Sequence, residues 1–237
     1  MRFNVVTLFP DMFPGYFSQS LLNKAIERGL VDVQIHDLRK WSEDKHNRVD
    51  DRPFGGGPGM VIMVEPVVKC VESILAEQPQ AKTILLTPQG KRLDQKRVEE
   101  LADFESFVFL CGRYEGFDQR VVDILQPEEI SVGDYILNGG EVASMVMIDS
   151  LMRMVPGVLG DEQSSIQDSF SSGNRMLEFA QYTRPREFRG HSVPEILLSG
   201  DHERIRKWRE EETLKRTKER RSDLLENNKK DGTKDLE

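Results

Sequence analysis

The sequence has few cysteines and no long apolar run. Its 237 residues include only two cysteines, Cys70 and Cys111, and they form no CxxC pair. Two cysteines without this spacing indicate free thiols in a reducing compartment and not a disulfide framework. The longest apolar stretch, Val142 to Ile148, is far below the ~18 residues that a membrane span needs, and no signal-peptide pattern precedes Pro10. We therefore expect a cytoplasmic protein with no transmembrane helix.

Several well-known catalytic signatures are also missing. The sequence holds no GxxxxGK[ST] phosphate loop and no GxSxG, and the glycine run at residues 55–59 does not fit GxGxxG because Met60 stands at the last glycine position. These absences argue against an ATPase, a Rossmann dehydrogenase and the commonest hydrolases. No metal spacing such as HExxH appears among the four histidines, so a structural zinc site is not expected. The histidines are His36, His46, His191 and His202.

Charge is unevenly distributed along the chain. The net charge is -8, and residues 1–200 carry 21 Lys and Arg against 30 Asp and Glu. Residues 204–221 carry nine basic residues against four acidic ones. Exposed charges are largely screened beyond ~8 to 10 Å, so a basic distal segment on an acidic protein can still bind a polyanion. The overall charge therefore does not exclude RNA as a partner.

Strand-like and helix-like segments alternate through the first 155 residues. This alternation predicts an α/β fold with a largely parallel sheet. The helix expected at 141–155 is apolar nearly all round, so it is predicted to be buried on several faces or to lie at a subunit interface. Strands are expected at 2–9, 31–35, 83–86, 107–110 and near 130, and the other helices at 20–28, 65–75, 94–102 and 118–125.

Composition changes after residue 159. Residues 160–174 are rich in Ser, Gly, Asp and Gln, which is typical of a flexible linker or lid. The chain then becomes basic and proline-rich after Tyr182 and helical from about His202. We predict an α/β domain over residues 1–159, a linker over 160–174, and a small helical domain over 175–237 whose last residues fray.

Three glycine-bearing loops follow predicted strands, at 87–90, 111–116 and 132–141. Open α/β sheets bind ligands at the carboxyl ends of their strands. One such loop usually only turns the chain, but three in succession favour a ligand pocket. Glycines let backbone groups approach a ligand closely, while Tyr135 and Leu137 can supply apolar walls.

Five motifs, in chain order, carry a resemblance to a known family. They are FGGGPGM at 54–60, CGRYEG at 111–116, SVGDYILNGGE at 131–141, PGVLG at 156–160, and DSF at 168–170 followed by YTRP at 182–185. Together they resemble the bacterial tRNA (guanine-N1)-methyltransferases, of the SPOUT class of knotted methyltransferases, from Met1 to about Leu225. The resemblance implies a parallel sheet with a deep C-terminal trefoil knot, a small helical C-terminal domain, and a homodimer whose active sites are shared. Threaded chains are too rare for the residue pattern alone to predict a knot.

The resemblance also implies that S-adenosyl-L-methionine, the methyl donor, binds bent within the knot. For Ile136, a place in the core remains an alternative. The implied pocket residues are Pro88, Gly112, Val132, Gly133, Asp134, Tyr135, Ile136, Leu137, Gly139 and Gly140.

The implied reaction is methylation of N1 of the guanosine immediately 3′ of the anticodon (position 37) in tRNA. N1 bears a proton at neutral pH, so alkylation needs a base, and a donor must hold the charge that moves onto the neighbouring carbonyl oxygen. The resemblance implies that Asp168 is the base and that Arg153 is the donor. A positioned base is worth ~100 to 10,000-fold, and a preorganised donor a comparable factor. Without the DSF context, Asp168 would be taken as a solvated loop residue.

Three further residues have two possible roles each. Glu115 either anchors substrate or helps to hold Mg²⁺, or it is a plain surface glutamate. Pro58 and Gly59 either lie against the flipped base or belong to a tight structural loop. Asp50 and Asp51 lie close in sequence to the motif at 54–60, and no role is assigned to them.

Arginines of the distal helix complete the implied site. Arg206, Arg209, Arg216 and Arg220 fall within roughly 80° on one helical face and are predicted to contact tRNA phosphates. The alternative is a solvated, salt-bridged face packed by Trp208.

Two rival functions stay open: a knotted methyltransferase acting on ribosomal RNA or another nucleotide, and a catalytically silent RNA-binding protein. The DSF and YTRP segments argue against the first, and Asp168 with Arg153 argues against the second.

Overall fold

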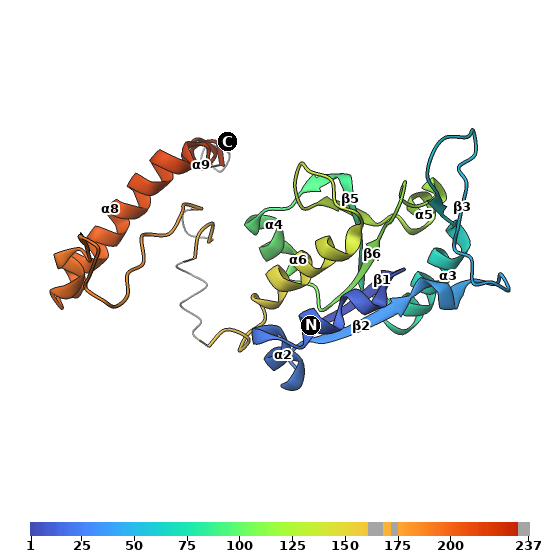
Figure 1. Cartoon of the computed structure of the whole chain (residues 1–237), viewed down its shortest axis with the longest axis horizontal. Coiled ribbons are helices and arrows are strands. Elements are labelled where there is room, and N and C mark those ends of the chain that lie inside the picture. Colours follow the sequence, from blue (N-terminus) through green and yellow to red (C-terminus); the bar gives the residue numbers. More distant parts are fainter. Residues whose placement is uncertain (161–167, 172–174, 232–237) are drawn as a thin grey trace. The chain divides into compact units, whose positions relative to one another are not determined.

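The computed structural model describes residues 1–160, 168–171 and 175–231, with side chains up to Glu226. The chain forms two compact units, Met1–Gly160 and Asp161–Glu237 (Figure 1). Most of the predicted linker at 160–174 lies outside the described residues. Within the described ranges, no helix is both long and apolar enough to span a membrane.

A five-stranded parallel sheet in the order β2-β1-β6-β5-β7 forms the centre of the first unit. This confirms the parallel α/β sheet predicted from the alternation of segments. Two short strands outside this sheet, β3 and β4, pair antiparallel to each other. The bounds are β1 (Arg2–Thr7), β2 (Asp32–Asp37), β3 (Asp50–Asp51), β4 (Val61–Ile62), β5 (Lys82–Arg92), β6 (Ser106–Cys111) and β7 (Glu128–Ser131).

Capping residues mark three of the helix ends in this unit. The side chains of Asp94 and Asp118 accept hydrogen bonds from backbone amides in the first turns of α4 and α5, and Gly29, with φ +69°, follows the end of α2. The bounds are α1 (Pro14–Phe17), α2 (Ser20–Glu27), α3 (Val64–Glu77), α4 (Gln95–Leu101), α5 (Gln119–Leu125) and α6 (Gly140–Met152), with 3-10 turns at Pro10–Met12 and Leu38–Trp41.

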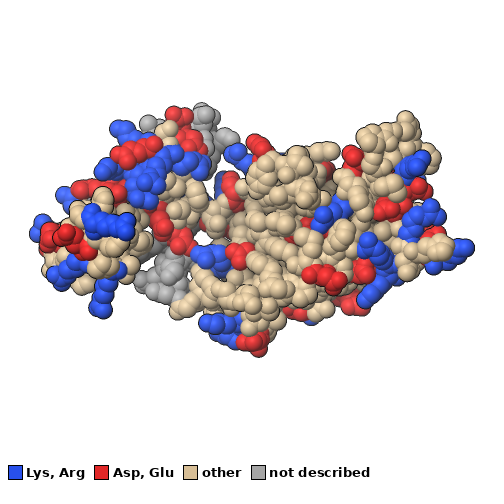
Figure 2. Space-filling view, in the orientation of Figure 1, with Lys and Arg blue, Asp and Glu red and all other residues tan. Residues whose placement is uncertain are grey.

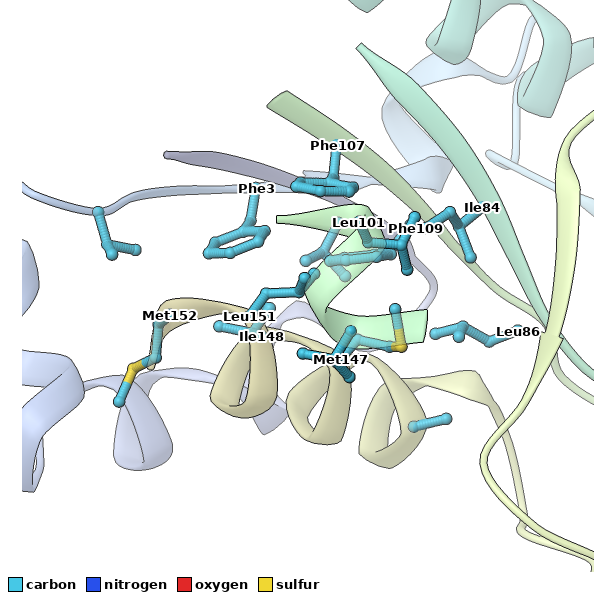
Figure 3. Packing of buried hydrophobic residues seen from close by; sticks show 14 of the residues in the cluster. Phe3, Ile84, Leu86, Leu101, Phe107, Phe109, Met147, Ile148, Leu151 and Met152 are labelled. Carbon is cyan, nitrogen blue, oxygen red and sulfur yellow. The ribbon is translucent and has the colours of Figure 1, made fainter. Parts of the chain in front are cut away.

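Alternating side chains of the strands divide the interior into two cores, one on each face of the sheet. Phe107 and Phe109 of β6 point to the face covered by α2, α4 and α6, whereas Val108 and Leu110 point to the face covered by α3 and α5. In the first core, Phe3, Phe107 and Phe109 stack with ring centroids 5.6 to 5.9 Å apart. Figure 3 shows these rings directed at the α6 residues Met147, Ile148 and Leu151. The sheet thereby holds α6 in place along its length.

Strand β5 is longer than predicted. The sequence predicts that the strand ends at Leu86 and that residues 87–90 form a turn, but β5 continues to Arg92 with an irregularity there. Leu86 and Lys91 both pair with Ile130 of β7. A Cβ at Gly90 would lie 2.6 Å from the Glu129 carbonyl oxygen, so glycine is required because the two backbones touch.

The second unit is a small, mostly helical structure. Its longest helix, α8 (His202–Arg220), begins where the sequence predicts, and the Asp201 side chain accepts a hydrogen bond from the amide of Arg204. Buried Thr217 of α8 accepts a hydrogen bond from the Leu177 amide at 3.0 Å, which ties the preceding segment to the helix. The remaining elements are β8 (Glu187–Phe188), β9 (His191–Ser192), a 3-10 turn at Glu195–Leu198, and α9 (Ser222–Asp231).

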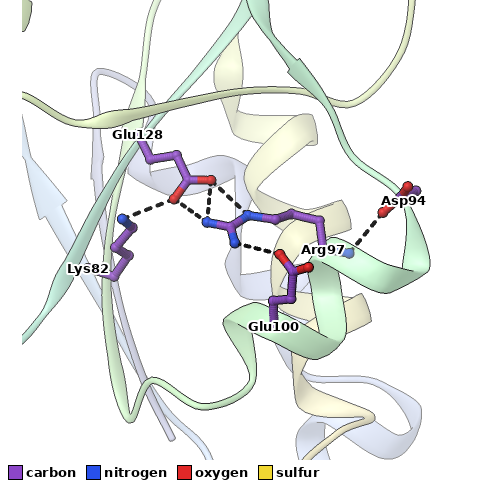
Figure 4. A network of polar contacts seen from close by, with 5 residues as sticks. All are labelled: Lys82, Asp94, Arg97, Glu100 and Glu128. Atoms are coloured by element: carbon purple, nitrogen blue, oxygen red, sulfur yellow. Dashed lines mark hydrogen bonds and ion pairs between the residues drawn. The ribbon is translucent and has the colours of Figure 1, made fainter. Parts of the chain in front are cut away.

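One ion-pair network links α4 to the edge of the sheet (Figure 4). Arg97 of α4 binds both carboxylate oxygens of Glu128 and also pairs with Glu100, while Lys82 lies 3.0 Å from Glu128. Burial by itself raises the pKa of Glu128, but the hydrogen bonds from Arg97 and Lys82 outweigh it and hold the pKa below its ordinary value. The folded state therefore favours the ionised carboxylate.

We expect Glu128→Gln to lower the free energy of unfolding by about 1 to 2 kcal/mol at pH 7. Because the folded pKa is depressed, this contribution is fully present above the unfolded pKa and is lost as pH falls through the folded value. Urea unfolding of wild type and variant between pH 7 and pH 3 measures the difference. It should shrink with acidification, whereas the exposed control Glu72→Gln should show little change. A difference that stays constant across this range would contradict the assignment.

Candidate active site

A cavity of about 320 Å³ lies at the carboxyl ends of β6 and β7, beside the irregular stretch of β5. It is lined by the three glycine-bearing segments that the sequence singled out, which the parallel sheet brings together from distant parts of the chain. All the predicted donor-binding residues line it except Asp134. They are Pro88, Gly112, Val132, Gly133, Tyr135, Ile136, Leu137, Gly139 and Gly140.

Asp134 turns away from the cavity. Its side chain is 88% exposed and lies 4.0 Å from Arg92. The reason is the neighbouring Tyr135, whose ring folds back over Gly133 and whose hydroxyl donates to the Val132 carbonyl at 3.2 Å. A side chain at Gly133 would collide with that ring, so the tight turn directs Asp134 outward.

An exposed apolar run forms one wall of the cavity. Ile136 is 82% exposed, and Tyr135 and Leu137 are also exposed. The alternative that Ile136 belongs to the core is therefore wrong. Apolar side chains left uncovered in a cavity wall provide a surface for an apolar part of a ligand.

The second and third glycine loops touch through their backbones, and we call this contact between residues 111–113 and 138–140 the loop crossing. The Gly140 amide donates to the Gly112 carbonyl at 2.9 Å, and a Cβ at Gly140 would lie 2.7 Å from the Cα of Cys111. Cys111 itself is fully enclosed, and burial raises the pKa of its thiol, so it stays protonated at neutral pH. The glycines are needed here for close crossing, and the cysteine is structural.

The loop at 54–60 docks on the CGRYEG loop. The Glu115 amide donates to the Met60 carbonyl at 3.1 Å, and a Cβ at Gly59, whose φ is +85°, would overlap the Glu115 side chain. Glu115 lines the cavity. Gly59 therefore contacts a residue that lines the pocket, while neither Gly59 nor its neighbour Pro58 lines it.

Two predicted catalytic residues belong to other segments of the chain. Arg153 follows the last residue of α6 and does not line the cavity, which meets the other end of that helix at Gly140. Thirteen helical residues span roughly 20 Å at 1.5 Å per residue. Asp168 belongs to the second unit, where it lines a separate cavity of about 490 Å³ together with Arg206 and Arg209.

The predicted arginine stripe on α8 divides into two kinds of side chain. Arg206 and Arg220 are exposed, and Arg206 pairs with Glu210 at 2.6 Å. Arg209 and Arg216 are half-buried, and among the described residues their Nε atoms have no hydrogen-bond partner. The Arg209 guanidinium lies 4.6 Å from the centre of the Phe179 ring. Figure 2 shows that acidic side chains are interspersed with the basic ones over this helix.

Other cavity residues were not singled out by the sequence. Arg113, Tyr114, Phe117 and Asn138 line the pocket. Arg113 and Tyr114 lie within the CGRYEG motif, so the motif itself was the available signal. Within the described part of the chain, no three His, Cys, Asp or Glu side chains cluster as they would around a metal ion.

A parallel α/β sheet with a glycine-lined cavity at its carboxyl edge defines a class of small-molecule-binding α/β proteins, to which many enzymes belong. Comparison with known proteins narrows the class. The family model for tRNA (Guanine-1)-methyltransferase TrmD matches residues 1–227.

Similar curated proteins agree with that match. A tRNA (guanine-N(1)-)-methyltransferase of Rhodopirellula baltica is 65% identical over 228 residues, which cover 95% of this chain and 94% of the relative. Proteins of the same name from Geobacillus kaustophilus and Geobacter sulfurreducens are 53% and 50% identical, and each match covers 95% of this chain and more than 90% of the relative. The chain belongs to the tRNA (guanine-1)-methyltransferase family, which confirms the resemblance seen in its motifs.

Proposed function

We propose that this protein transfers the methyl group of S-adenosyl-L-methionine to N1 of the guanosine immediately 3′ of the anticodon in tRNA. The observation that carries the proposal is the cavity at the carboxyl ends of β6 and β7, lined by three glycine-bearing segments in a chain of this family. The relatives' shared name supplies the reaction and the atom that is methylated. The position in tRNA comes from the resemblance of the motifs.

The pocket residues fit the proposed methyl donor. Tyr135, Ile136 and Leu137 leave an apolar wall uncovered in a cavity of about 320 Å³, a volume within the ordinary range for small-molecule sites. Because they have no side chains, the glycines at 112, 139 and 140 let a ligand approach the backbone closely, while the Gly140 amide and the Gly112 carbonyl are already paired with each other. When bound, the donor would supply an electrophilic methyl group on a sulfonium.

Two residues of the chain would manage the charge of the reaction. The N1 proton of guanine must leave as the new bond forms, and a carboxylate such as Asp168 can accept it. Electron density moves onto the neighbouring carbonyl oxygen, where the Arg153 guanidinium can donate hydrogen bonds. Glu115, on the rim beside Gly59, would hold the target base against the pocket.

The domain arrangement and knot belong to the same proposal. Residues 1–159 would form the donor-binding catalytic domain and residues 175–237 the tRNA-binding domain. The deep trefoil knot of the SPOUT class would be formed by the segment 132–140 as it passes the loop at 111–116. The backbone contact of Gly140 with Cys111 and Gly112 supports this, because a threaded segment must pass its loop closely.

A homodimer with shared active sites completes the proposal. Val142 and Val146 lie one turn apart on α6 and are 45% and 43% exposed, an apolar stripe that a second copy of the chain would cover. Arg153 lies about a helix length away from Gly140 within one chain. A partner subunit that supplies Asp168, and Arg153 with it, would complete each pocket.

The direct test is methyl transfer from labelled S-adenosylmethionine to unmodified tRNA with guanosine 3′ of the anticodon. The expected result is transfer to that guanosine and none to a transcript in which it is replaced by adenosine. Transfer to ribosomal RNA instead would favour a different knotted methyltransferase. Tight tRNA binding without transfer would favour a silent RNA-binding protein.

We expect the two exposed arginines of α8 to contribute to tRNA affinity through phosphate contacts. Arg206→Gln and Arg220→Gln should each weaken tRNA binding and reduce the slope of log affinity against log salt by about 1. Filter binding at several salt concentrations measures both. The matched control is Arg2→Gln. Arg2 is an exposed arginine at the amino end of β1, and it pairs with Asp32. Unchanged slopes for both α8 variants would mean that these arginines form only a solvated helix face.

A further inference from the structure

Glu141 carries a carboxylate that is fully buried at the start of α6. Its Oε1 accepts a hydrogen bond from the Thr7 hydroxyl at 2.8 Å, and its Oε2 accepts one from Arg113 Nε at 2.8 Å. The Thr7 hydroxyl in turn accepts a hydrogen bond from the Phe9 amide at 2.9 Å. A single carboxylate therefore joins the end of β1, the CGRYEG loop and the first turn of α6.

Arg113 extends this junction in the other direction. Its guanidinium donates to the Asn138 carbonyl at 3.3 Å, and it lies 4.4 Å from the centre of the Phe9 ring. Its side chain is only 16% exposed. The cation is thus held by an anion, a carbonyl and an aromatic face, and it joins two of the three loops that line the pocket.

The ion pair occupies the volume that a side chain at position 139 would need. A Cβ on Gly139 would overlap Arg113 Nε and lie 2.6 Å from Glu141 Oε2. Gly139 and Arg113 also form an isolated antiparallel bridge. The ion pair can therefore form only because residue 139 has no side chain. Gly139 and the ion pair both belong to the loop crossing beside the pocket.

Stability alone does not account for such a pair. Burying a carboxylate and a guanidinium costs several kcal/mol per ion, and apolar residues of similar volume often stabilise a protein equally well. The pair does, however, fix a single geometry, because its members are joined to three separate segments. A rigid crossing is what a preorganised ligand pocket requires.

We propose that Glu141 and Arg113 are positioning residues that lock the loop crossing, and that affinity for the methyl donor depends on their ion pair. The inference rests on the proposed function, since S-adenosylmethionine is the ligand that the crossing would serve. Glu141 acts through Arg113 and the backbone of residues 138–140.

The test is a double-mutant cycle on S-adenosylmethionine affinity, measured by calorimetry with the full-length protein. Glu141→Gln keeps the shape but removes the charge, and we expect it to weaken donor binding by about 10-fold or more. Arg113→Met should weaken it similarly. The double variant should be no weaker than either single variant, because both remove the same lock. In methyl-transfer kinetics, the loss should appear in the KM for the donor more than in kcat.

A variant at a distance separates positioning from simple loss of stability. Arg97→Met breaks another ion pair, with Glu128 at the amino end of β7, and neither residue lines the pocket. It should lower the melting temperature without changing donor affinity. Thr7→Val provides a milder second lesion, because it removes one hydrogen bond to Glu141 and leaves both charges in place. We expect it to weaken donor binding by several-fold.

The outcomes are distinguishable. If wild type binds S-adenosylmethionine and Glu141→Gln and Thr7→Val bind it equally well while folded, the positioning role is overturned. Additive losses in the double variant would overturn it as well, because they would mean that Arg113 contacts the donor independently of Glu141. If wild type itself shows no donor binding, the proposed function fails instead.

Discussion

Asp168→Asn is expected to reduce single-turnover methyl transfer by about 100-fold or more while donor affinity stays near that of wild type. Asparagine matches aspartate in shape, but its amide cannot accept the N1 proton of guanine, so the base is lost while the packing is kept. Asp168 lines the cavity of the second unit. Because the substitution keeps the shape of the side chain, donor binding should change little, and calorimetry with rapid-quench transfer assays measures the two effects separately.

Asp134→Asn is the matched control for this prediction. It removes a carboxylate that is adjacent to pocket residues in sequence but 88% exposed and directed outward. Its transfer rate and donor affinity should both remain near wild type. An Asp168→Asn enzyme that keeps most of its single-turnover rate would show that another group accepts the proton.

A mixture of two inactive parents that reassociates at random is expected to recover about a quarter of wild-type activity. One parent carries Asp168→Asn and the other carries a blocked donor pocket. If each pocket uses the Asp168 of its partner, one site of the mixed dimer combines both lesions and the other has none. Random reassociation makes about half of all dimers mixed, and half of their sites are then intact.

The structure guides the choice of the pocket variant. Gly140→Trp would block the pocket, but a Cβ there already lies 2.7 Å from the backbone of Cys111, so folding would suffer. Leu137→Trp is preferable, because Leu137 lines the pocket and is 37% exposed. Calorimetry should show that this parent has lost donor binding, and gel filtration that it still forms dimers.

The measurement is methyl transfer after the two parents, carrying different affinity tags, are unfolded together, refolded and purified over both tags. Doubly tagged dimers should have about half of the wild-type rate, and the unfractionated mixture about a quarter. Doubly tagged dimers with no more activity than their parents would refute the shared site. The methyltransferase assignment would be unaffected, since a site built within one chain also fits that chemistry.

The sequence determined the secondary-structure pattern and the family. Phe107 and Phe109 alternate with Val108 and Leu110, which requires a strand buried on both faces. Asp94, Asp118 and Gly29 mark helix ends through local hydrogen bonds and backbone conformation. These signals depend on neighbours within a few residues, so they can be read from the sequence without knowing the fold.

The motifs also located most of the pocket in advance. The glycine-bearing segments at 111–116 and 132–141 line one cavity because the strands that precede them are parallel and end at the same edge. The sequence could not show that Asp134, unlike the residues on either side of it, does not line the pocket. The outward turn of Asp134 follows from the ring of Tyr135 folding over Gly133, a contact that depends on side-chain conformation.

Tertiary structure alone decided which polar groups meet across long stretches of chain. Glu141 and Thr7 are 134 residues apart in sequence, and their hydrogen bond exists only because α6 begins beside the end of β1. Similarly, the periodicity of α8 places four arginines on one face, but Arg209 is half-buried because the Phe179 ring of the preceding segment packs against it. Local sequence sets the direction in which a side chain leaves its helix or strand, and only the packed neighbours determine whether it meets water, an ion partner or a ring.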